Sequence, residues 1–167
     1  EEEQGKVPVG MAMQRIDARE KVLGTGEYPD DVYLDGMIYA SAVRSKYPRA
    51  RVLAIHTKKA RGLQGVVGVF TANDIPGDIK VGHLKQDWDA LIPVGGMTHY
   101  LGDAICLVAA ESMEVLEEAK SLVEVDYEVQ EGVFDPFEAL KEGAPKVHES
   151  GNILAHEHLI RGDAGQA

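Results

Sequence analysis

Several residue types and sequence patterns are scarce in this 167-residue chain. It has one cysteine, one tryptophan and three phenylalanines, and no apolar run approaches the length that a membrane helix needs. The single cysteine, Cys106, has no partner for a disulfide within the chain, and a reduced, cytoplasmic setting fits this usage. Apolar content of 44% and charged content of 27% are ordinary for a globular protein, and the length fits one domain. We therefore expect one globular domain that does not span a membrane.

Complete catalytic and metal-binding motifs are also missing. No serine stands in a G-x-S-x-G frame, and Gly24-Thr25-Gly26 lacks the third glycine and following helix of a dinucleotide-binding loop. A zinc site near the end of the chain is a possible interpretation, but the spacing fits no standard ligand set and no thiolate is near. The residues of that group are His148, Glu149, His156, Glu157 and His158. The sequence thus predicts no catalytic, cofactor-binding or metal-binding residue in this chain.

Positive charge is concentrated in one segment. Residues 44–61 contain seven of the 17 basic residues and none of the 28 acidic ones, so this basic block carries +7 and the rest of the chain −18. Nucleic-acid sites usually combine overall basic charge with interleaved aromatics, and only Tyr47 interrupts the block. We predict a docking face for an acidic partner, with solvated loop ends as the alternative, and no nucleic-acid site. The candidate docking residues are Arg44, Arg49, Lys58, Lys59 and Arg61.

Hydrophobic periodicity and turn residues predict a strand–strand–helix–strand unit at residues 37–77. Tyr47-Pro48 marks a bend, because proline fixes φ and biases the preceding residue away from helix. Thr57 is expected to cap the helical turn, and Gly62 to end it in a left-handed conformation. The predicted elements are strands at 37–44, 51–56 and 66–70 and a helical turn at 58–61. Such a unit is a folding nucleus for a small α+β domain.

The second half repeats strong local signals. Residues 104–110 are wholly apolar, which is typical of a strand at the centre of a sheet. Ser112 is a predicted N-cap for an amphipathic helix at 113–123, and residues 124–129 form the next predicted strand. Asp135-Pro136 is expected to open a last helix that Gly143 ends.

Ordered sequence phrases add a resemblance to a known family. They are RIDAREKV at 15–22, RSKYPRARV at 44–52, TANDIPG at 71–77, VEVDYE at 123–128 and GAPKVHE at 143–149. In this order they resemble the N-terminal α/β hammerhead segment of the large subunit of molybdenum hydroxylases, the xanthine dehydrogenase and aldehyde oxidase family. The resemblance covers about residues 10–163.

The resemblance implies an α+β fold of the α/β-hammerhead type, with a small mixed or antiparallel sheet and two principal helices. It divides the chain into a flexible lead-in at 1–9, a single hammerhead domain at 10–163, and at 164–167 the truncated start of a connection to molybdenum-binding domains. The family's metal-gripping motifs lie downstream of the matched region. We therefore expect this chain to be inactive alone and to act as a structural piece. The rival interpretation is a free-standing acidic binding module with a basic docking patch, and a third, weaker one is a nucleic-acid binder.

For the parent enzyme, the resemblance implies hydroxylation of an N-heterocycle or aldehyde with water as the oxygen source. The implied cofactor is molybdenum-molybdopterin, with iron–sulfur clusters and usually FAD in the complex. The implied partners are the molybdenum-binding domains of the same subunit and the iron–sulfur and FAD domains or subunits.

The loop at 77–96 is too long and too apolar for a neutral connector. The family places the equivalent loop beside the funnel that leads to the metal centre. By that resemblance, Leu84 and Trp88 are expected to line a substrate channel. The alternative is that Trp88 seals the domain's own core.

Overall fold

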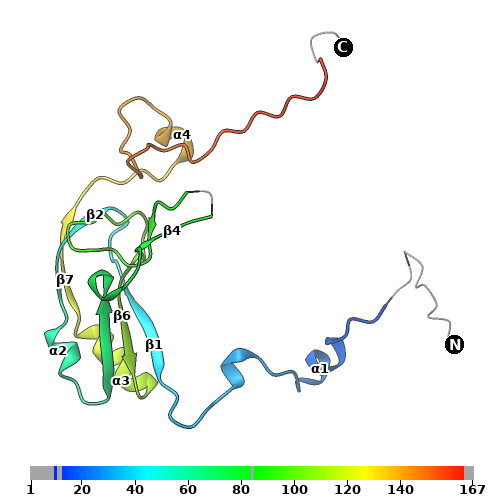
Figure 1. Cartoon of the computed structure of the whole chain (residues 1–167), viewed down its shortest axis with the longest axis vertical. Helices are drawn as coiled ribbons and strands as arrows, with labels where there is room; N and C mark the ends of the chain where they lie inside the picture. Colours follow the sequence, from blue (N-terminus) through cyan, green and yellow to red (C-terminus); the bar gives the residue numbers. More distant parts are fainter. Residues whose placement is uncertain (1–9, 11–12, 84, 164–167) are drawn as a thin grey trace. The chain divides into compact units, whose positions relative to one another are not determined.

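The structure is a computed structural model that describes residue 10 and residues 13–83 and 85–163 (Figure 1). Contacts divide the chain into two compact units, Glu1–Met37 and Ile38–Ala167. The predicted lead-in at 1–9 and the terminal stretch at 164–167 fall outside the described residues. The single-domain boundary at 10–163 stays a prediction.

The first unit contains a short helix, α1 (Ala18–Leu23), and a 3-10 turn, η1 (Pro29–Asp31). Asp17 precedes α1, and its carboxylate pairs with Lys21 at 2.9 Å and with Arg15. These contacts, that of Lys21 first, hold the pKa of Asp17 below its usual value. No residue of α1 is buried, so local pairing rather than core packing supports this helix within its unit.

The second unit is centred on an antiparallel sheet in the order β1 (Tyr39–Arg44), β6 (Ala104–Ala110) and β3 (Val66–Thr71). Val43 lies opposite Cys106 on one side, and Val69 lies opposite Val108 on the other. Figure 1 shows β1 and β6 side by side. The apolar run at 104–110 is therefore the central strand of this sheet, as its sequence predicts.

Helix α3 (Met113–Ser121) covers one face of this sheet. Ser112 caps it, because its Oγ accepts a hydrogen bond from the backbone N–H of Val115 at 3.3 Å. Leu116 and Ala119 are buried with Cys106 and Val108, so alternate residues of β6 meet the apolar stripe of the helix. The short helix α2 (Lys58–Arg61) adds its buried Ala60 to this core.

A second antiparallel pair joins β2 (Ala50–His56) to β7 (Glu124–Val129). It encloses a smaller core of Val52, Ile92 and Ile105. Ile105 belongs to β6, so this strand contributes to both cores through its two faces. Ile92 comes from the loop at 77–96, and that loop therefore fills part of its own domain's core.

The remaining elements are small. The loop at 77–96 contains a hairpin of β4 (Lys80–Val81) and β5 (Trp88–Asp89), and η2 (Ala72–Asp74) precedes it. Helix α4 (Pro136–Ala139) opens as predicted, because Asp135 Oδ1 accepts from the backbone N–H groups of Phe137 and Glu138. It ends at Ala139 rather than near Gly143, so the second of the expected principal helices is a single turn.

One turn differs from its prediction. Gly62 has φ −86° and is not left-handed, and Thr57 makes no capping hydrogen bond to the backbone of α2. The positive φ falls instead at Gly65, at +86°. A Cβ at Gly65 would touch the side chain of Val115 at 3.4 Å, so close packing against α3 adds to the preference for glycine. The fold class is otherwise confirmed: an α+β domain with small antiparallel sheets and few helices.

Candidate functional site

Three rings, of His99, Tyr100 and His148, gather around Trp88. The ring centroid of Trp88 lies 5.6 Å from His99, 5.3 Å from Tyr100 and 5.8 Å from His148. The rings of His99 and His148 stack at 4.9 Å with an interplanar angle of 14°. These four residues, which we name the Trp88 cluster, belong to neither hydrophobic core. The strand β5 and two separate loop segments of the second unit therefore meet at one point.

A buried carboxylate positions the His99 segment. Asp103 is 1% exposed, and its two oxygens accept from the backbone N–H groups of His99 at 3.0 Å and Ala104 at 3.1 Å. His99 Nδ1 lies 3.5 Å from Asp103 Oδ2. This nitrogen is buried and has no hydrogen-bond partner among the described residues. Asp103 thus fixes the backbone that presents His99 to Trp88.

Asn152 arranges the segment that carries His148. Its Oδ1 accepts from the backbone N–H of Val147 at 2.7 Å. Its Nδ2 donates to the carbonyls of Ala139 and Pro145 at 2.9 and 3.0 Å. One amide therefore ties the end of α4 to residues 145–147 and sets the approach of His148.

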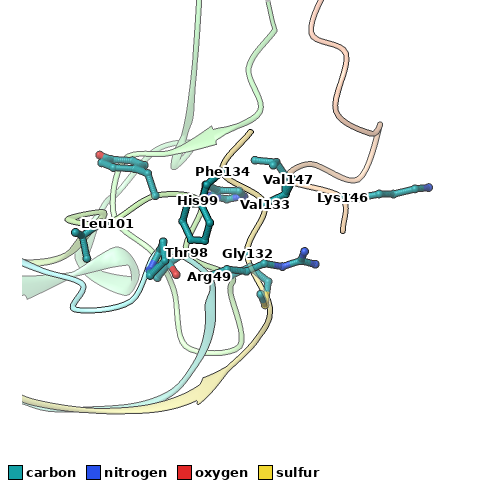
Figure 2. Close-up of a pocket in the computed structure, with 12 residues that line it drawn as sticks. Arg49, Thr98, His99, Leu101, Gly132, Val133, Phe134, Lys146 and Val147 are labelled. Atoms are coloured by element: carbon teal, nitrogen blue, oxygen red, sulfur yellow. The ribbon is translucent and has the colours of Figure 1, made fainter. Parts of the chain in front are cut away.

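A cavity of about 450 Å³ lies beside this cluster (Figure 2). Thr98 and His99 line it together with Arg49 and Lys146. Its apolar walls are Pro48, Met97, Leu101, Val133, Phe134 and Val147. We call it the Phe134 cavity. Its volume falls within the range of small-molecule and side-chain pockets.

A second cavity, of about 740 Å³, has Trp88 in its wall. Val81, Ile153 and Leu154 give it an apolar lining, and Asp87 and His148 add polar groups. Asp87 Oδ2 lies 3.9 Å from His148 Nδ1. Trp88 is thus half-buried, with one part in the Trp88 cluster and another at an open cavity. Leu84, the other predicted channel residue, lies outside the described residues, and the channel role of both stays a prediction.

The structure separates the predicted docking residues into two groups. In the first group the charge is paired within the chain: Lys59 Nζ lies 2.6 Å from Glu124, and Arg61 lies 3.8 Å from Asp74. In the second group, Arg44 donates to the carbonyl of Gly102 at 2.9 Å and Arg49 to that of Glu131 at 3.3 Å, and Lys58 forms no ion pair with a described residue. The docking role of all five stays a prediction, and no described carboxylate compensates the charge of the second group.

Acidic residues of strand β7 pair with Lys59 of the first group and with two neighbouring side chains of β2. Besides the Lys59–Glu124 pair, Arg51 lies 3.5 Å from Glu128 and His56 lies 2.9 Å from Asp126. The contact with Lys59 holds the pKa of Glu124 below its ordinary value of 4.5. The acids at 124, 126 and 128 alternate with a period of two, and this signal in the sequence is the one that could have linked β7 to the basic block.

Metal-binding and redox groups are sparse among the residues that the structure describes. No three or more His, Cys, Asp or Glu side chains are placed there to hold a metal ion. Cys106 is fully buried, and burial raises the pKa of its thiol to about 11. It behaves as a small core residue rather than a reactive thiol.

Within the described part of the chain, no helix is both long and apolar enough to traverse a bilayer.

The arrangement of small antiparallel sheets, one of them covered by α3, is the fold of a known domain class. The family model of the "Aldehyde oxidase and xanthine dehydrogenase, a/b hammerhead domain" matches residues 23–131. That match spans more than half of the chain, so the chain belongs to this family.

Individual relatives agree with the family. The chain is 35% identical over 159 residues to the "Nicotinate dehydrogenase large molybdopterin subunit" of Eubacterium barkeri, covering 95% of this chain and 37% of the relative. It is 32% identical over 162 residues to the "Xanthine dehydrogenase molybdenum-binding subunit" of Escherichia coli O157:H7, covering 91% and 21%. The solved CO dehydrogenase from Oligotropha carboxidovorans superimposes with a TM-score of 0.72 at 34% identity, over 81% of this chain and 17% of that one. The chain therefore spans well under half of the length of each of these relatives.

Proposed function

We propose that the chain is the hammerhead segment of a molybdenum hydroxylase large subunit and packs against the molybdenum-binding domains of that subunit. The observation that carries the proposal is the family match at residues 23–131 in a chain that spans only 37% and 21% of two relatives. A segment of this size can act as a scaffold in a larger subunit, because a scaffolding role requires no metal ligands. The reducing, cytoplasmic setting suggested by one buried thiol fits the proposal.

The parent enzyme would hydroxylate an N-heterocycle or an aldehyde with water. Molybdenum-molybdopterin would supply that chemistry, and iron–sulfur clusters and usually FAD would carry the electrons away. Among the described residues, no three or more His, Cys, Asp or Glu side chains are placed together to hold a metal ion. We therefore assign no chemical step to this chain.

Within this role, Trp88 forms part of the wall of the substrate entrance. Its half-exposed ring borders the 740 Å³ cavity, and the Trp88 cluster fixes its orientation through His99 and His148. A rigid aromatic wall selects flat substrates by contact, without taking part in bond making. The same ring would be fully enclosed if its purpose were only to seal the core, as Ile92 does.

The complete enzyme carrying Trp88→Ala tests this role. We expect KM or the preference between substrates to change several-fold, while molybdenum content stays at the wild-type level, because the ring contacts substrate but not the metal centre. Leu53→Ala is the matched control, since Leu53 is 52% exposed on β2 and lines neither the 740 Å³ cavity nor the Phe134 cavity. Unchanged kinetics in Trp88→Ala would remove Trp88 from the entrance.

A further inference from the structure

The Phe134 cavity combines apolar walls with one sign of charge. Six of its lining residues are apolar, and among the described residues that line it Arg49 and Lys146 are the only Lys, Arg, Asp or Glu residues. The described lining contains no acidic residue, although the chain as a whole carries a net charge of −11. Figure 2 shows the Arg49 and Lys146 side chains extending to the same side of the view, the side opposite Leu101.

Both cations lack a carboxylate partner among the described residues. Arg49 donates only to the backbone carbonyl of Glu131, at 3.3 Å, and Lys146 forms no ion pair there. Their neighbours differ, because Arg51, Lys59 and Arg61 are each paired with an acid. The electrostatic requirement of Arg49 and Lys146 is therefore met by water or by a partner.

The rim of the cavity also exposes large apolar side chains to water. Phe134 is 80% exposed and Leu101 is 67% exposed. An apolar hollow bordered by exposed aromatic and aliphatic groups is typical of a surface that another protein segment covers.

We infer that the Phe134 cavity receives an apolar side chain from the rest of the large subunit, flanked by an aspartate or glutamate that pairs with Arg49 and Lys146. The apolar anchor fills the space between Leu101 and Val133, and the carboxylate reaches the side where the two cations extend. A guanidinium group and a carboxylate form two parallel hydrogen bonds, so Arg49 favours an acidic partner over a neutral one. The inference rests on the proposed membership in a larger subunit, of which this chain would supply a docking socket.

Site-specific photo-crosslinking in the complete large subunit tests the socket. A benzophenone amino acid replaces Leu101 in the cavity wall, and Leu53 on β2 in a control of similar exposure. After irradiation, mass spectrometry identifies the crosslinked peptides. We expect the Leu101 probe to crosslink to one segment outside residues 1–167 that contains an acidic residue beside the attachment point, and the Leu53 probe not to reach that segment.

Charge reversal then tests the electrostatic part. Arg49→Glu should lower the yield of the Leu101 crosslink at least about tenfold, because a repulsive pair replaces an attractive one. Arg49→Lys should keep much of the yield, since the charge remains. Lys58→Glu is the matched control, because Lys58 is a cation of the same basic block that has no described ion pair and does not line the cavity, and the yield should not change.

Four outcomes would overturn the inference: a crosslink confined to this chain, a crosslink to a second copy of it, a crosslink to a segment without acidic residues, or no crosslink from the Leu101 probe. Occupation of the cavity by a small anion alone would give the last of these outcomes. If the same preparation contains molybdenum and Trp88→Ala alters its KM, the failure belongs to the socket alone. If the complete protein contains no molybdenum, the proposed function has failed.

Discussion

The helix-covered sheet and the Trp88 cluster are stabilised in different ways. Around β6 and α3, side chains such as Val108 and Leu116 are fully buried, and they come from two consecutive regular elements. The Trp88 cluster is assembled from the short strand β5 and two irregular segments, and its rings keep part of their surface exposed. Single polar side chains, Asp103 and Asn152, hold the two irregular segments in place.

The comparison indicates which region supplies stability and which presents a surface. Fully buried aliphatic side chains raise the free energy of unfolding, whether or not a partner is bound. A half-exposed group of aromatic rings in contact with one another offers less stabilisation but a defined shape to a ligand or partner. Substitutions should therefore lower the free energy of unfolding most at the helix-covered sheet, and change binding more than stability at the Trp88 cluster.

The largest expected effect is that of Leu116→Ala. Leu116 is 1% exposed between α3 and β6, so its truncation leaves a cavity and should lower the free energy of unfolding by about 2–5 kcal/mol. Urea denaturation followed by circular dichroism measures it. The exposed Leu53, changed to alanine, should alter stability by less than about 0.5 kcal/mol. Equal losses in the two variants would contradict the assignment of the core.

An intermediate effect is expected for Trp88→Ala. The ring contacts three other rings but is not fully buried. We therefore expect the free energy of unfolding to fall by about 1–2 kcal/mol, less than for a core aromatic residue. Trp88→Phe should lose about half as much stability as Trp88→Ala, because a smaller ring keeps some stacking. The same urea titration serves as the measurement. A loss of about 3–5 kcal/mol in Trp88→Ala would place the ring in the core instead.

The smallest expected effect concerns the exposed Lys59–Glu124 pair, and it depends on pH. The pKa of Glu124 is lowered in the folded chain, first by its hydrogen bond with Lys59. A lowered folded pKa means that the contribution is present above the ordinary value of 4.5 and is lost as pH falls through the folded value. Because the pair is exposed, the contribution is small and weakens with salt.

Urea midpoints of wild type and Lys59→Gln, measured between neutral and acidic pH, test this pair. The difference should be greatest at neutral pH and vanish in acid. Lys58→Gln should show no such dependence, since Lys58 has no carboxylate partner among the described residues. A difference that persists at the acidic end would show that Lys59 acts by other means.

Local patterns predict the regular elements well. The bounds of β6 and β7 agree with the predicted strands at 104–110 and 124–129, because apolar runs and alternation are visible in short windows. Ser112 and Asp135 act as N-caps for the same reason. Helix α4 is shorter than predicted, because Pro136 and Gly143 mark where a helix is allowed to begin and end rather than how far it extends.

The sites could be predicted only in part. Trp88 stands out as the single tryptophan in a long apolar loop, whereas His99 and His148 meet each other across about fifty residues and have no local signal. Asp103 and Asn152 likewise act through contacts that only the folded chain creates. The charge of Arg49 is visible in the sequence, but its separation from the paired cations Lys59 and Arg61 depends on the acids of β7 and η2.

Metal and activity analysis of the purified chain tests most directly the central claim, that this chain is scaffolding in a larger molybdenum enzyme. The 167-residue chain, purified from cells that make the molybdenum cofactor, should unfold cooperatively, contain no molybdenum and hydroxylate neither N-heterocycles nor aldehydes. The complete large subunit, prepared in parallel, should contain molybdenum. Stoichiometric molybdenum or hydroxylation by the chain alone would contradict the claim.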